Sequence, residues 1–167
     1  MVGAHLLLYL VKTNVSVRAI HREGSNLRNV ENVFSYYNED SAKLFQKIDW
    51  VLGDINDIPA LEKAFIDIDY VYHAAAMISF DPADFEQLMK INVEGTANIV
   101  NLSVANSIKK LCHVSTIGTI GKSVNSGLAD EESEWSDDNI NVYARSKYEA
   151  EMEVWRGSQE GLSVVMV

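Results

Sequence analysis

The sequence predicts a doubly wound parallel α/β sheet, and two features of its pattern carry that prediction. Short apolar runs alternate with longer segments at helical spacing, which is typical of parallel strands covered by helices. Small or polar residues follow several of these runs directly, at the strand ends where open sheets of this class bind ligands. The 167 residues contain no repeat, linker or low-complexity tract, so we expect one domain over residues 1–167.

The first half is expected to begin with a helix that is hydrophobic nearly all round and therefore buried. Its last helix carries Pro59 in the first turn, where proline is favoured. The expected elements are a helix at 3–12, a strand at 15–20, helical spacing over 26–46, a strand at 49–52 and a helix at 59–66.

The second half continues the alternation and ends on a strand. The expected elements are a strand at 70–73, a long helix at 84–107, a strand at 111–114, a loop at 115–139, a helix at 142–156 and a strand at 162–167. A buried first helix should follow a strand, and parallel strands need helices on both faces. We therefore expect the domain to extend beyond both ends of this sequence.

Composition limits the classes of function. The chain carries 24 acidic and 14 basic residues, a net charge of −10, which disfavours binding to nucleic acid or to anionic membranes. No apolar stretch reaches the length of a spanning helix. The one cysteine cannot form an internal disulfide, and the four histidines have no metal-ligand spacing, so we expect a cytoplasmic protein without a metal site.

Tyr143 and Lys147 are the first candidates for chemistry. They are four residues apart and share one face of a helix. An ammonium group beside a phenol favours the phenolate, which suits a Tyr that exchanges a proton with a carbonyl or an alcohol. The same spacing is also common between residues that are only surface neighbours.

Further candidates follow strand ends. Thr116 follows the strand at 111–114, and Asp54 follows the strand at 49–52, where it could accept a hydrogen bond from a base amine. The small residues Ala74, Ala75 and Ala76 would let a flat ligand approach the backbone. Each feature has a plainer interpretation, as a turn cap, a helix cap or tight packing.

Taken in order, these motifs resemble the extended short-chain dehydrogenase/reductase family, the NAD-dependent epimerase/dehydratase group, and within it the dihydroflavonol-reductase-like branch. The matching stretches are GDIND at 53–57, YHAAA at 72–76, SFDPADFEQLMKINVEGT at 79–96, INVEGTANIV at 91–100, HVSTIGTIG at 113–121 and YARSK at 143–147. The resemblance implies a Rossmann-like sheet, apparently without its first strand and without the C-terminal substrate region.

The resemblance also implies roles for single residues. Tyr143 would be the catalytic acid/base, Lys147 the residue that assists it and bonds the nicotinamide ribose, and Thr116 the hydroxyl that orients the reacting carbonyl. Asn92 would support the site. Asp54 and Ile55 would flank the adenine, and Ala74, Ala75 and Ala76 would line the wall of the cofactor site.

Two departures from the family pattern concern the cofactor. The family opens with a TGxxGxxG loop that holds the pyrophosphate, and only Gly3 could be the last of its glycines. Arg22 follows the strand at 15–20, near the place where NAD-specific members carry an acidic residue. It could pair with a 2′-phosphate, which favours NADP over NAD, or it could be a solvated surface residue.

Three functions follow. The first is an NADP-linked oxidoreductase that reduces a carbonyl or oxidises an alcohol on a small organic substrate. The alternatives are an NAD-dependent nucleotide-sugar epimerase or dehydratase, and a non-catalytic nucleotide-binding protein. Because family members often pair through the helices equivalent to 84–107 and 142–156, we also expect a possible homodimer.

Overall fold

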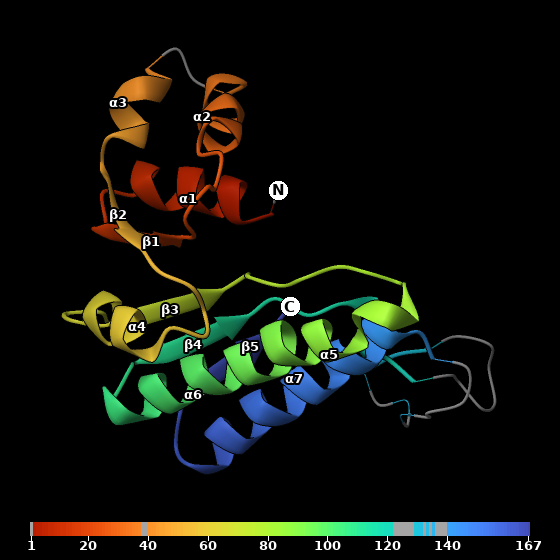
Figure 1. Cartoon of the computed structure of the whole chain (residues 1–167). Helices are drawn as coiled ribbons and strands as arrows, with labels where there is room; N and C mark the ends of the chain where they lie inside the picture. Colours follow the sequence, from red (N-terminus) through yellow and green to blue (C-terminus); the bar gives the residue numbers. More distant parts are fainter. Residues whose placement is uncertain (1, 38–39, 122–128, 132, 134, 136–139) are drawn as a thin grey trace. The chain divides into compact units, whose positions relative to one another are not determined.

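The computed structural model describes residues 2–37, 40–121, 129–131, 133, 135 and 140–167 (Figure 1). These residues form two compact units, Met1–Ile66 and Asp67–Val167, and each is described by itself. The expectation of one domain over 1–167 stays a prediction. In the described part of the chain, no helix is both long enough and apolar enough to cross a bilayer.

The described part of the first unit contains two parallel strands and four helices. Strand β1 (Val17–His21) lies beside β2 (Ile48–Leu52), with Val17 opposite Ile48. The helices are α1 (Val2–Lys12), α2 (Arg28–Ser35), α3 (Ser41–Phe45) and α4 (Ile58–Ala64). Asp57 caps α4 by accepting a hydrogen bond from the backbone N–H of Ala60, and Pro59 occupies its first turn as predicted.

The core of the first unit corrects one expectation. It consists of Leu8, Val11, Val17, Phe34 and Ile48. Only Leu8 and Val11 of α1 are buried, whereas Tyr9 is 67% exposed, so the prediction of a helix buried on nearly all sides is wrong for this structure. The reason is geometric, because residues three and four apart on a helix share one face, and only the face that carries Leu7, Leu8, Leu10 and Val11 packs against the core.

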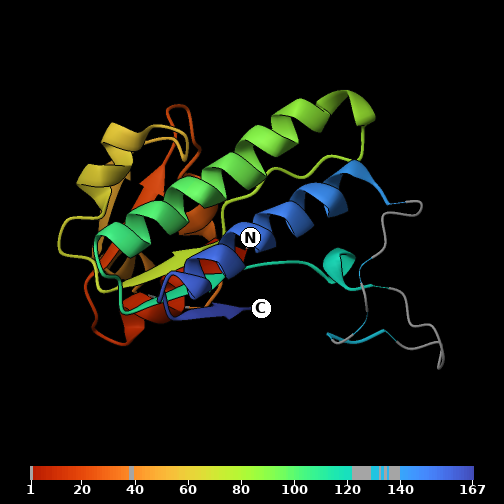
Figure 2. The same ribbon diagram turned by 90° about the horizontal axis from the view of Figure 1, so that it is seen from below.

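The second unit contains a three-stranded parallel sheet in the order β3-β4-β5. The strands are β3 (Tyr70–His73), β4 (Lys110–His113) and β5 (Val164–Met166). Helices α6 (Gly95–Ala105) and α7 (Val142–Gln159) lie side by side along this sheet (Figures 1 and 2). With parallel strands and covering helices in sequence order, the predicted fold class is confirmed.

The long helix predicted at 84–107 is not uniform. It begins with a 3₁₀ turn, Pro82–Asp84, and one α-helical turn, α5 (Phe85–Leu88). A π-helical segment, Met89–Glu94, then leads into α6. π-Helical turns are rare and are frequently found at functional sites, so this segment is a candidate for a functional role, and it contains Asn92.

Helices α6 and α7 approach each other closely at Gly157. A Cβ atom at this position would lie 2.6 Å from Cγ1 of Val100. Buried side chains fill the rest of this layer, including Leu111 of β4 and Ala150 and Val154 of α7. The packing fixes α7 against the sheet and thereby fixes the residues on its first two turns.

Candidate active site

The first two turns of α7 carry Tyr143 and Lys147, and the Lys147 side chain reaches the end of β4. Asn141 starts the helix, and its side-chain oxygen accepts a 2.8 Å hydrogen bond from the backbone N–H of Ala144. Lys147 lies one turn after Tyr143 and is 2% exposed. The predicted pair therefore occupies one face of a helix whose start is fixed by a side-chain cap.

The Lys147 ammonium group is held by atoms of β4 and of the residue that follows it. Nζ donates a 2.8 Å hydrogen bond to the carbonyl oxygen of Val114 and lies 3.3 Å from Nε2 of His113. Burial lowers the pKa of Lys147 to about 8, and the charge of Glu151 one turn further along α7 partly opposes that shift. Lys147 is thus mainly cationic at neutral pH and has few partners to share its charge.

Tyr143 is half-buried, and its ring contacts an aromatic residue from another segment. The ring of Phe80 meets it edge-on, with a distance of 5.7 Å between the ring centroids. No described residue forms a hydrogen bond with the Tyr143 hydroxyl group. The phenol therefore keeps its donor and acceptor capacity for another molecule.

Ser115 and Thr116 follow β4, and their hydroxyl groups differ in what they contact. The Ser115 hydroxyl donates a hydrogen bond to the Glu151 carboxylate, which occupies its proton. Thr116 caps the 3₁₀ turn Ile117–Thr119, and its Oγ1 only accepts, from the Gly118 backbone N–H at 3.3 Å. Within the described residues the Thr116 proton has no acceptor, which suits the role predicted for Thr116 as a hydrogen-bond donor.

The 3₁₀ turn after Thr116 packs against the start of α7. A Cβ atom at Gly118 would lie 3.3 Å from the Cβ of Ala144, the residue next to Tyr143. The turn that carries Thr116 and the turn that carries Tyr143 are therefore neighbours. The absence of a side chain at Gly118 permits this approach.

Asn92 holds the segment after β3 against the π-helical turn. Its Oδ1 accepts a 2.7 Å hydrogen bond from the Met77 N–H, and its Nδ2 donates to the Met77 carbonyl at 3.0 Å and to Ser146 Oγ at 2.9 Å. The side chain is 1% exposed, and these three bonds use its amide. Asn92 thus links the segment that carries Phe80 to α7, as a positioning residue.

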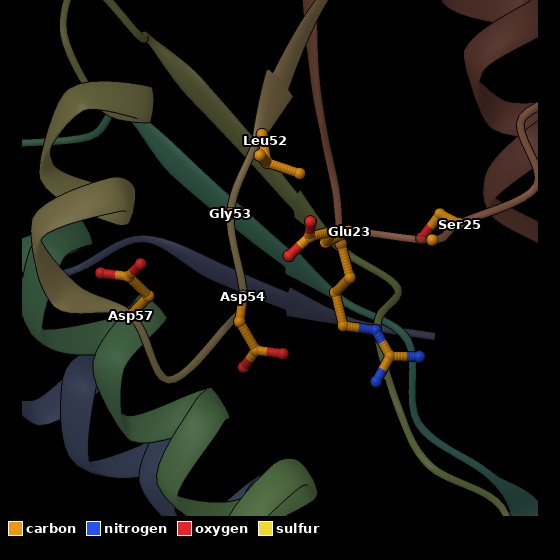
Figure 3. A pocket seen from close by; sticks show the side chains of 8 residues that line it. Glu23, Ser25, Leu52, Gly53, Asp54 and Asp57 are labelled. Carbon is orange, nitrogen blue, oxygen red and sulfur yellow. The ribbon is translucent and has the colours of Figure 1, made fainter.

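The first unit contains an open pocket between the ends of its two strands (Figure 3). One wall follows β1 and the other joins β2 to α4. Its lining residues are Arg22, Glu23, Gly24, Ser25, Leu52, Gly53, Asp54 and Asp57.

The polar groups of this pocket are suited to parts of a nucleotide. Arg22 is exposed and has no ion-pair partner among the described residues, so its guanidinium is available to an anion. Asp54 accepts a hydrogen bond from the Asn56 N–H with one oxygen, which leaves the other for a donor. At Gly53 a Cβ would lie 3.1 Å from the Ala60 Cβ, so this wall needs glycine to stay close to α4.

The remaining predicted cofactor residues fall into both units. Ile55 is half-buried in the segment between β2 and α4, and Gly3 lies in the first turn of α1, where an added Cβ would meet nothing within 4 Å. Ala74, Ala75 and Ala76 follow β3 directly, and the last two are exposed. The structure gathers Arg22 and Asp54 in one unit and Thr116, Tyr143, Lys147 and Asn92 in the other.

Several polar residues at these sites were not among the predicted site residues. Glu23 lines the pocket beside Arg22, Glu151 contacts Ser115, and His113 contacts Lys147. Glu151 lies one helical turn after Lys147, a spacing that could have identified it. His113 is fully buried at the end of β4, and its contact with Lys147 joins residues 34 apart in the sequence, which no local pattern shows.

A family model and a curated relative both match this chain over nearly its whole length. The model of the NAD dependent epimerase/dehydratase family matches residues 1–167. A putative dihydroflavonol 4-reductase from Synechocystis is 32% identical over 99% of this chain and 45% of its own length. The chain thus spans about half the length of the curated relatives it matches.

Solved structures give the same fold. The terminal R domain from the myxalamid PKS-NRPS biosynthetic pathway superposes with a TM-score of 0.81 at 28% identity, over 99% of this chain and 45% of that one. A UDP-glucuronic acid 4-epimerase from Bacillus cereus, in complex with NAD, gives a TM-score of 0.77 at 22% identity, over 98% of this chain and 51% of that one. At that identity the second likeness concerns the fold alone.

Proposed function

Because the chain belongs to the NAD dependent epimerase/dehydratase family, we propose that it forms the cofactor and acid/base part of an NADP-linked oxidoreductase. Its reaction would reduce a carbonyl or oxidise an alcohol on a small organic substrate. The observation that carries this proposal is the buried Lys147 ammonium group, held one helical turn from a Tyr143 whose hydroxyl has no described partner.

The proposed chemistry assigns one task to each residue. A bound nicotinamide cofactor supplies or accepts the hydride. Tyr143 gives a proton to the substrate oxygen in reduction and takes it back in oxidation. The Lys147 ammonium stabilises the phenolate that remains after proton donation, and Thr116 donates a hydrogen bond to the same substrate oxygen.

We assign NADP on the basis of the first-unit pocket. Arg22 could form a charge-assisted pair with a 2′-phosphate, and the Ser25 hydroxyl on the same wall could donate to it. Asp54 could accept from the adenine amine. Gly3, Ile55, Ala74, Ala75 and Ala76 remain proposed contacts of the same cofactor.

An NAD-dependent epimerase or dehydratase is the second candidate, and Glu23 favours it. This carboxylate lines the pocket next to Arg22 and could accept hydrogen bonds from the ribose hydroxyls while repelling a 2′-phosphate. The two candidates therefore differ in which neighbouring side chain governs the cofactor.

Fluorescence titration of the chain with NADPH and NADH tests the choice. We expect tighter binding of NADPH, with Arg22→Gln reducing that preference about tenfold, as loss of one charge-assisted pair would. Glu23→Gln is the matched control and should leave or increase the preference for NADPH. Tighter binding of NADH that Glu23→Gln abolishes would reverse the assignment.

Turnover tests the acid/base role separately. With NADPH and a panel of aldehydes and ketones, Tyr143→Phe should reduce kcat by about 10²–10⁴-fold. Its cofactor affinity should stay within about twofold of the unmodified chain. Tyr148→Phe, one residue after Lys147 on α7, is the matched control and should retain turnover.

We further propose that the protein works in the cytoplasm and can form a homodimer. The single cysteine, Cys112, fits a reducing compartment. On α7, Met152 and Trp155 are 40% and 48% exposed and could contribute to a helix-mediated interface. Sedimentation equilibrium of the chain and of Trp155→Glu would show a dimer that the substitution dissociates, and a monomeric unmodified chain would contradict it.

A further inference from the structure

Two buried histidines lie beside Lys147, and the proposed chemistry uses neither. His73 ends β3, His113 ends β4, and the strand register places them opposite each other. Their ring centroids are 5.0 Å apart, and the residues are 4% and 0% exposed. Burial, followed by the charge of Lys147, lowers the pKa of His73 to about 3 and that of His113 to about 2, so both rings are neutral at pH 7.

The contact between Lys147 and His113 has a defined direction. An ammonium group has donors and no acceptor, so Nε2 of His113, 3.3 Å from Nζ, must be the acceptor. A neutral imidazole that accepts at Nε2 carries its proton on Nδ1. His113 is therefore expected as the Nδ1–H tautomer.

His73 has the opposite arrangement. The Thr96 hydroxyl donates its proton to the Asn92 carbonyl at 2.5 Å, so its oxygen accepts from Nε2 of His73 at 2.9 Å. His73 then carries its proton on Nε2 and is bound to α6. Of the two rings, only that of His113 has a described contact with the ammonium group.

The other nitrogen of His113 bears the cost of this tautomer. Nδ1 is buried and has no hydrogen-bond partner within the described part of the chain. An unpaired buried donor is unfavourable, and such groups in folded proteins call for an explanation. The explanation here is the contact with Lys147, because the alternative tautomer would direct an N–H toward an ammonium group.

We propose that His113 is a positioning residue for Lys147. Its Nε2 accepts a hydrogen bond from the Lys147 ammonium group and thereby keeps the positive charge near the turn of α7 that carries Tyr143. The Val114 carbonyl oxygen and Nε2 of His113 then accept hydrogen bonds from two of the three ammonium N–H groups. The third N–H group bonds neither of them. The titratable groups that face Lys147 are His113 from β4, His73 from β3 and Glu151 from α7. The catalytic meaning of this role rests on the proposed function, but the contact itself does not.

The tautomer of His113 is the first test. We would record the ring nitrogen signals of the whole chain, labelled with ¹⁵N-histidine, at pH 7 and assign His113 by its loss in His113→Gln. The expected spectrum has a protonated Nδ1 and an unprotonated Nε2 for His113, and the reverse for His73. A protonated Nε2 on His113 would overturn the proposal.

The pKa of Lys147 is the second test, followed through the Nζ signal and assigned with Lys147→Arg. His113→Leu removes the acceptor at similar size and should lower the Lys147 pKa by about one unit, because the charged form loses a hydrogen bond. His113→Gln places an amide oxygen near the position of Nε2 and should restore it to within a few tenths of a unit. A merely structural role would make the two variants alike.

A substitution at His73 is the matched control for the variants of His113. His73→Gln alters the neighbouring buried ring, which does not bond Lys147, and should leave the Lys147 pKa within a few tenths of a unit. If His113→Leu does not fold, the tautomer of His113 and the Lys147 pKa in His113→Gln still test whether His113 accepts a hydrogen bond from Lys147. Neither readout needs cofactor or substrate, so loss of turnover in Tyr143→Phe tests the proposed function independently.

Discussion

At the scale of single residues, the site combines groups that are paired with groups that are not. Asn92 and Ser115 use their polar atoms on neighbouring segments, whereas the hydroxyls of Tyr143 and Thr116 are not fully used. Paired groups fix geometry, and unpaired groups remain free to bind another molecule. This division separates positioning residues from candidates for chemistry, and local sequence pattern alone does not show it.

Stability should fall as the pH drops below about 6.5. In the unfolded chain His73 and His113 take up protons near 6.5, but in the folded chain burial keeps them neutral until about pH 3 and about pH 2. Between these values the unfolded state binds more protons, so acid favours unfolding by at most about 1.4 kcal/mol per pH unit for each histidine.

Urea unfolding between pH 7 and pH 5 measures this dependence. His73→Gln should reduce the histidine contribution to the slope by about half. Asn106→Ala, an exposed substitution that removes no titratable group, should leave the slope unchanged. Equal slopes for all three proteins would refute the burial of neutral histidines as the cause.

Asn92→Ala should destabilise the folded chain by about 2–3 kcal/mol, because it removes three hydrogen bonds and leaves both backbone groups of Met77 without their partner. Asn106→Ala is the control, since that exposed side chain makes one bond within its own helix and should cost less than about 0.5 kcal/mol. Urea unfolding at pH 7 compares them. Similar losses in both would mean that Asn92 does not link the segments as described.

At the scale of elements, periodicity located the strands and helices within a few residues. The strand predicted at 70–73 coincides with β3, and the strand predicted at 111–114 is shifted by one residue from β4. The π-helical turn inside the predicted helix was missed, because apolar spacing hardly changes when a single turn widens. The burial of α1 was overestimated for a related reason, since composition does not say how many faces of a helix are covered.

Gly157→Ala should destabilise the protein by about 1–3 kcal/mol although alanine favours helix by about 1 kcal/mol. The added Cβ would lie 2.6 Å from Val100 and force α6 and α7 apart. Gly3→Ala on α1 is the matched control, and with nothing within 4 Å of its Cβ it should stabilise by up to about 1 kcal/mol.

The double variant Gly157→Ala/Val100→Ala separates the clash from other effects. Removing the Val100 methyl groups should recover part of the loss, so the two substitutions should be less than additive. Thermal unfolding of the four proteins measures this coupling. Strict additivity would show that the close approach of α6 and α7 is not the cause.

At the scale of the whole molecule, the order of the motifs identified the family, but the sequence did not show which side chains contact one another. Each motif is one continuous stretch of the sequence, so a single sequence displays it. The contact of His113 with Lys147 depends instead on how α7 packs on β4, and the pocket of Arg22 and Asp54 depends on the pairing of β1 with β2. Such contacts are set by tertiary packing, which local pattern does not encode.

Net charge leads to the last prediction, which concerns salt. Each ion pair of the described residues has a partner that is more than a third exposed, so each is worth about 0–1 kcal/mol and weakens as salt is added. Against this stands the self-repulsion of a chain with 24 acidic and 14 basic residues, which salt also screens. The chain has ten more acidic than basic residues, and this excess is larger than the number of weak ion pairs among the described residues. We therefore expect the relief of repulsion to affect stability more than the weakening of the ion pairs. Raising NaCl from about 10 mM to about 150 mM at pH 7 should therefore increase the free energy of unfolding by about 1 kcal/mol, measured with urea, and a decrease would mean that the surface pairs stabilise the protein more than their exposure suggests.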